Sequence, residues 1–146
     1  MSESMLFIGS FVAYTGLGIS TTLTFRGTFD RRVAAAVAVI VTAHVFGIWS
    51  HRYGWDFNEA VRNGYAGFIL FHLSLIAIDA AVFVPDRLGT LFHRAAFVVV
   101  SLGSIVAAFT YDAVAIYRIP LLFVLVMTII LSVRGHRART EEPHTA

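Results

Sequence analysis

The chain has 146 residues, of which 58% are hydrophobic and only 14% are charged. A soluble domain needs about a quarter of its residues charged to cover its surface, so this composition excludes a soluble globular protein and predicts a polytopic membrane protein. The absence of cysteine excludes disulfides and thiol chemistry, and a net charge of +2, with arginines at the ends of apolar segments, excludes a nucleic-acid-binding domain.

Five apolar stretches follow one another along the chain, each about as long as the roughly 20 residues that a helix needs to cross a bilayer. They predict transmembrane helices at about 5–25, 33–50, 64–84, 91–111 and 118–133. Polar segments at 26–32, 51–63 and 85–89 separate the first four. The predicted fold class is therefore all-α, a five-helix transmembrane domain at 1–134 with a cytoplasmic tail at 135–146.

The apolar region 91–133 is too long for a single crossing. As one helix it would measure about 65 Å, roughly twice the ~30 Å hydrocarbon core of a bilayer. Polar residues and Pro120 interrupt it between 111 and 120. Proline is tolerated in the first turn of a helix, where its missing N–H has no partner to lose, so we expect a hairpin with a new helix beginning near 118.

The arginines predict the orientation of the chain in the membrane. In a five-span topology, eight arginines lie on the side of the first loop, the third loop and the tail, and three lie on the other side. Because cytoplasmic loops carry an excess of positive residues, the N-terminus is expected outside and the C-terminus in the cytoplasm, in a multi-pass protein of the cell (plasma) membrane.

Ionisable groups inside the predicted spans are the candidate functional residues, because a bilayer excludes them unless they face the bundle interior. His44 and His72 lie near the middle of the second and third spans, and these consecutive spans are expected to be antiparallel neighbours. The sequence therefore predicts two imidazoles at one depth, directed into a common interior space.

Two neutral imidazoles in an apolar bundle are the axial ligands that a haem iron requires. We therefore predict haem b as a cofactor, with His44 and His72 as its iron ligands. The implied function is a small redox subunit that passes electrons to a quinone or to partner membrane subunits. The alternative is structural: each histidine hydrogen-bonds a hydroxyl on a neighbouring helix. Hydroxyls at similar heights are those of Thr15, Thr42, Ser74, Ser101, Ser104 and Thr128.

Asp79 lies seven residues after His72 on the same face of its helix, about one turn inside the cytoplasmic boundary. A buried carboxylate must either pair with a donor or stay protonated. Arg94 and the neighbouring His93, near the start of the fourth span, are the nearest candidate partners. The two hypotheses are a structural ion pair between Asp79 and Arg94, and a proton pathway that runs from Asp79 to His72.

The same residues fit further function classes. One is a small proton-coupled carrier or channel, as a homo-oligomer, with Asp79 and the histidines as its pathway. Another is a membrane enzyme on a lipid or isoprenoid substrate, with His72 and Asp79 as acid and base. A third is an accessory subunit of a larger membrane complex. The sequence assigns no catalytic residue and leaves open whether the protein is an enzyme.

Overall fold

The computed structural model describes residues 3–62 and 64–141, and the regular secondary structure of this part of the chain is helical. Its elements in chain order are α1 (Glu3–Phe25), α2 (Arg31–Arg52), α3 (Phe57–Ala60), α4 (Tyr65–Ala80), α5 (Asp86–Thr110), the 3-10 helix η1 (Asp112–Tyr117) and α6 (Arg118–Glu141).

Among the described residues, four helical segments are long and apolar enough to cross a membrane: Met5–Phe25, Arg31–His51, Asp86–Thr110 and Val114–Ala138. The prediction of a helical membrane protein is confirmed to this extent. The third predicted span, 64–84, is only partly helical. Its helix α4 has 16 residues and rises about 24 Å, short of the roughly 30 Å hydrocarbon core, and turns follow it at 81–83. Helix length alone therefore does not establish five crossings.

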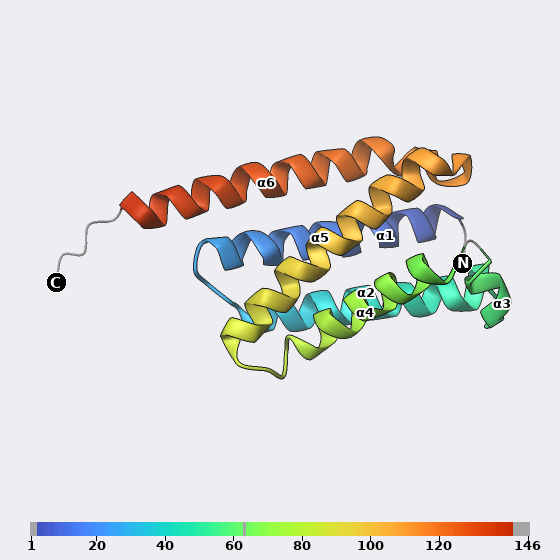
Figure 1. The fold of residues 1–146 in the computed structure, drawn as a ribbon, viewed down its shortest axis with the longest axis horizontal. Coiled ribbons are helices and arrows are strands. Elements are labelled where there is room, and N and C mark those ends of the chain that lie inside the picture. Colours follow the sequence, from blue (N-terminus) through green and yellow to red (C-terminus); the bar gives the residue numbers. More distant parts are fainter. Residues whose placement is uncertain (1–2, 63, 142–146) are drawn as a thin grey trace.

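The helices form a bundle in which successive long helices run in opposite directions (Figure 1). Helix α1 contacts α2, α5 and α6, whereas α4 packs against α5 and α2. Helix α5 crosses α1 diagonally, and α6 extends past the end of the bundle. As a result, the start of α1 and the end of α6 lie at opposite ends of the molecule.

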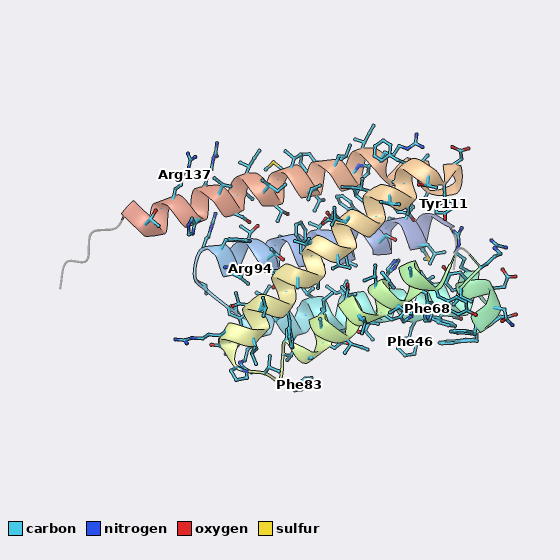
Figure 2. All side chains as sticks on the ribbon, in the orientation of Figure 1. Phe46, Phe68, Phe83, Arg94, Tyr111 and Arg137 are labelled. Atoms are coloured by element: carbon cyan, nitrogen blue, oxygen red, sulfur yellow. The ribbon has the colours of Figure 1, made fainter. Side chains whose placement is uncertain are left out.

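The bundle presents large apolar side chains to its surroundings and encloses small and hydroxyl-bearing ones. Phe46 is 58% exposed and Phe83 is 84% exposed, and both lie on the outside of the bundle (Figure 2). In contrast, α1 buries Ser20, Thr21 and Thr24 against its neighbours. A soluble protein shows the opposite arrangement, so the packing agrees with a lipid environment, in which small and polar residues bring helices together.

The break predicted within 91–133 is present. Helix α5 ends at Thr110, and Pro120 lies in the first turn of α6. The predicted tail at 135–146 instead begins as a continuation of α6 to Glu141, and residues 142–146 lie outside the described part.

Near the end of α6, Gly135 leaves room for the aliphatic part of the Arg26 side chain: a Cβ on Gly135 would lie 2.5 Å from Arg26 Cγ. Arg26, directly after α1, therefore packs against α6 at Gly135.

Candidate functional site

The candidate site lies between α2 and α4, where Asp79 meets Thr42. The Thr42 hydroxyl lies 3.1 Å and 3.2 Å from the two carboxylate oxygens of Asp79, and it donates its single proton to them. In the described ranges 3–62 and 64–141, Asp79 makes no salt bridge. A neutral hydroxyl therefore holds this half-buried carboxylate, which keeps lone pairs for a further donor.

A groove opens beside this carboxylate. It has a volume of about 610 Å³ and an almost entirely apolar wall. Its lining residues are Ala35, Ala38, Val39, Thr42, Ala43, Asp79, Val82 and Phe83. The small side chains belong to α2, and the absence of bulk there creates the depression. Because Val39 is 69% exposed and Phe83 84% exposed, the groove opens to the outside of the bundle, where lipid chains are expected.

His44 is directed toward α1 rather than toward α4. Its Nε2 atom lies 2.9 Å from the Ser10 hydroxyl oxygen. The same hydroxyl lies 3.0 Å from the Leu6 carbonyl, to which it can donate, so Ser10 links the imidazole to the backbone of α1. The other nitrogen, Nδ1, faces Gly9, where a Cβ would come within 2.6 Å of it. Gly9 is therefore what allows the imidazole to fit against α1.

His72 is directed toward α2, and both of its ring nitrogens have partners. Trp49 donates its indole N–H to Nε2 at 3.2 Å, and Nδ1 donates to the Phe68 carbonyl at 2.8 Å. The ring also stacks on Phe68, with centroids 4.0 Å apart, and meets Trp49 edge-on. The structural alternative expected each histidine to hydrogen-bond a hydroxyl on a neighbouring helix. His72 does bond to a neighbouring helix, but its partner is the Trp49 indole.

The structure does not bring the two predicted haem ligands into one pocket. His44 lies in the α1–α2 interface and His72 in the α2–α4 interface. As arranged, His72 has no nitrogen left for a metal, and the remaining nitrogen of His44 is pressed against α1. Within the described residues no group of three or more His, Cys, Asp or Glu side chains gathers to hold a metal ion. A haem would require both rings to turn away from their present partners.

The helix register explains this separation. Trp49 contacts His72, and Thr42 contacts Asp79, so the two contacts lie seven residues apart on each of two antiparallel helices. In this register His72 is level with Trp49, five residues beyond His44. At 1.5 Å per residue, the two imidazoles differ in height by about 7–8 Å. Residues 44 and 49 also differ by about 140° around the helix, which directs them toward different neighbours.

Asp79 and Arg94 do not form the predicted ion pair. The Arg94 guanidinium donates to the Thr24 hydroxyl at 2.9 Å and to the Thr24 carbonyl at 2.6 Å, and it lies over the Phe25 ring. It therefore caps the end of α1, whereas Asp79 faces α2. The predicted neighbour His93 is fully buried, and its ring packs edge-on against Phe29.

Asp79 and His72 both face α2 but lie two helical turns apart, about 10 Å along the axis. Each has its own partner on α2, and Leu75 and Ile76 occupy the intervening turns. A direct proton transfer between the two side chains would need bridging groups. Their separation also leaves the acid–base pair of the lipid-enzyme hypothesis without a shared substrate position.

Sequence reasoning named Thr42 only as a hydroxyl for a histidine and did not name Ser10 or Trp49 as partners. The available signal was spacing: residues 35, 38, 42 and 49 of α2 recur at helical intervals and share one face. This face packs against α4 and lines the groove, and His44 lies off it.

Comparison of the chain with protein-family models, with curated proteins and with solved structures finds no match.

Proposed function

We propose that this chain is a small proton-coupled carrier of the cell membrane, in which Asp79 binds and releases the transported proton. The observation that supports the proposal is the position of Asp79: a carboxylate in an apolar groove between two helices, held by one neutral hydroxyl. A carboxylate in such a place binds a cation or a proton in preference to remaining alone, because an unpaired charge in an apolar medium is costly.

The proposal includes five crossings, with α4 as the short third one. Helix α4 packs against α2 and α5 and runs antiparallel to both (Figure 1). Turn residues 81–84 extend its reach before α5 begins. A short span next to a groove can be matched by local thinning of the bilayer, at a cost of fractions of a kcal/mol per Å. This topology places the N-terminus outside and the C-terminus in the cytoplasm.

The test is proton flux into liposomes that contain the purified protein. We expect flux above that of protein-free liposomes, reduced to the protein-free level in Asp79→Asn, which keeps the shape of the side chain but cannot ionise. Asp79→Glu retains a carboxylate and should restore part of the flux. Glu59→Gln is the matched control, because Glu59 pairs with Arg62 on the exposed α3 segment. Equal flux in the wild-type protein and Asp79→Asn would refute the proposal.

A further inference from the structure

The groove beside Asp79 has two chemically distinct parts. One is an apolar wall of small α2 side chains, Ala35, Ala38 and Ala43, which is open to the outside of the bundle. The other is the Asp79 carboxylate, which lies level with Thr42. A ligand that fills both parts must have a flexible apolar portion and a group that complements a carboxylate. The volume of the groove, about 610 Å³, lies within the roughly 300–1,000 Å³ typical of small-molecule sites.

Charge complementarity identifies the polar group of that ligand as a cation. Asp79 receives one hydrogen bond donor, Thr42, and makes no salt bridge with any residue that the structure describes. An ammonium group supplies N–H donors as well as positive charge, and a charge-assisted hydrogen bond is about twice as strong as a neutral one. Phe83 lies one turn after Asp79 in the groove lining and is 84% exposed.

The apolar part of the groove runs from the carboxylate along α2. Asp79 is the last residue but one of α4 and lies level with Thr42, near the middle of α2. Ala38 and Ala35 lie one and two turns from Thr42 toward the start of α2. A ligand whose cation meets Asp79 therefore extends its apolar portion along these alanines.

We propose that the groove binds amphiphilic primary or secondary amines from the bilayer, as ammonium ions, and that they are the cargo exchanged for the proton. The inference rests on the proposed function, because it uses Asp79 as the site of exchange. When the ammonium binds, the protonated carboxyl releases one proton, so one cation replaces another and the charge in the groove is unchanged.

The experiment measures octylamine binding to the protein in lipid nanodiscs by equilibrium dialysis, with empty nanodiscs as the baseline. Octanol, which has the same chain without the charge, is the matched probe. We expect saturable octylamine binding, weakened roughly 10-fold to 100-fold in Asp79→Asn, and no saturable octanol binding. Octylamine binding equal in the wild-type protein and Asp79→Asn, or saturable octanol binding of similar strength, would overturn the proposal.

Two phenylalanine substitutions on α2 test the groove itself. Ala43 is exposed and lines the groove, whereas Ala36 is exposed on the same helix outside it. Ala43→Phe should reduce octylamine affinity at least about 10-fold and Ala36→Phe should leave it unchanged. Equal loss in both variants would overturn the proposal. A dimeric wild-type protein that becomes monomeric in Ala43→Phe, measured by light scattering, would show a second copy in the groove and would also overturn it.

Flux and binding separate the two proposals. Asp79-dependent proton flux without octylamine binding would overturn the amine site and leave the proton carrier in place. Asp79-dependent octylamine binding without flux would support the amine site, and it would refute both the carrier and the exchange of the amine for the proton. Circular dichroism of each variant, compared with the wild-type protein, checks that the helices are intact.

Discussion

His93 is a polar residue that is buried in apolar surroundings. The side chain has no exposed surface, and neither ring nitrogen has a hydrogen-bond partner among the described residues. Its ring packs edge-on against Phe29, with centroids 5.7 Å apart. Gly89, one turn earlier on α5, leaves the space that Phe29 occupies, since a Cβ there would meet the Phe29 ring at 2.6 Å. The surroundings of this imidazole are therefore those of an apolar side chain.

Replacing His93 with leucine should stabilise the protein. A buried polar group without a partner costs about 1–3 kcal/mol, and leucine has a similar volume and no polar atoms. We expect the free energy of unfolding in detergent to rise by about 1 kcal/mol, measured by chemical denaturation.

His136→Leu is the matched control, because His136 is exposed on α6 and its replacement should leave stability unchanged. A loss of stability in His93→Leu would contradict the prediction and would show that the imidazole has a partner in the folded protein, such as an internal water.

At the scale of the elements, arginines stabilise the ends of other helices. Arg94 of α5 binds the Thr24 carbonyl at the end of α1, and Arg118 binds the Ala108 carbonyl near the end of α5 at 2.8 Å. Arg31 binds the carbonyls of Val82 and Val84 after α4, both at 2.8 Å. The last carbonyls of a helix have no partner within it, and a cation there also complements the helix dipole. The arginines thus have a structural role beyond orienting the chain.

Arg31→Ala should loosen the turn between α4 and α5. The guanidinium binds two carbonyls and the Asp86 carboxylate, which lies 2.8 Å away. Because Arg31 is about half exposed, solvent screening reduces the loss, and we expect about 1 kcal/mol of destabilisation. Amide hydrogen exchange at 82–86 should become faster. Arg31→Lys should restore only part of the protection, because an ammonium lacks the planar fork of the guanidinium.

Arg87→Ala is the control for this prediction. Arg87 is exposed in the same segment, and the structure gives it no hydrogen bond or ion pair within the described residues. Unchanged exchange at 82–86 in Arg31→Ala, or equally fast exchange in Arg87→Ala, would contradict the capping role.

At the scale of the whole molecule, the topology depends on α4. If it crosses, the loop at Thr28 and the end of α6 at His136 lie on one side, and Asn58 and Asp112 lie on the other. If α4 does not cross, Asp112 lies on the same side of the membrane as Thr28, and His136 lies on the same side as Asn58. Whether the protein crosses the membrane four or five times depends on α4, which has 16 residues. Among the described residues, four other segments are long enough to cross.

The chain contains no cysteine, so single cysteines can be introduced and labelled without removing native ones. We expect Asn58→Cys and Asp112→Cys to react with a membrane-impermeant maleimide added outside intact cells. Thr28→Cys and His136→Cys should react only after the membrane is permeabilised. Labelling of Asp112→Cys only after permeabilisation, together with external labelling of His136→Cys, would contradict five crossings.

The sequence by itself determined the membrane-helical class and the approximate positions of the helices. Both follow from the length and hydropathy of each segment, and these properties are local. The break before Pro120 was predictable for the same reason, since a single helix over 91–133 would exceed the bilayer.

Only the tertiary structure decided which polar residues meet. Each residue turns the helix by about 100°, and helices that are apolar on all sides give no sign of which face meets which neighbour. His44 therefore met Ser10 on α1, and Asp79 met Thr42 rather than Arg94. The axial position of α4 against α2 also set the heights of the two histidines, which differ by about 7–8 Å. Rotation and shift depend on contacts between helices, which no single segment of the sequence specifies.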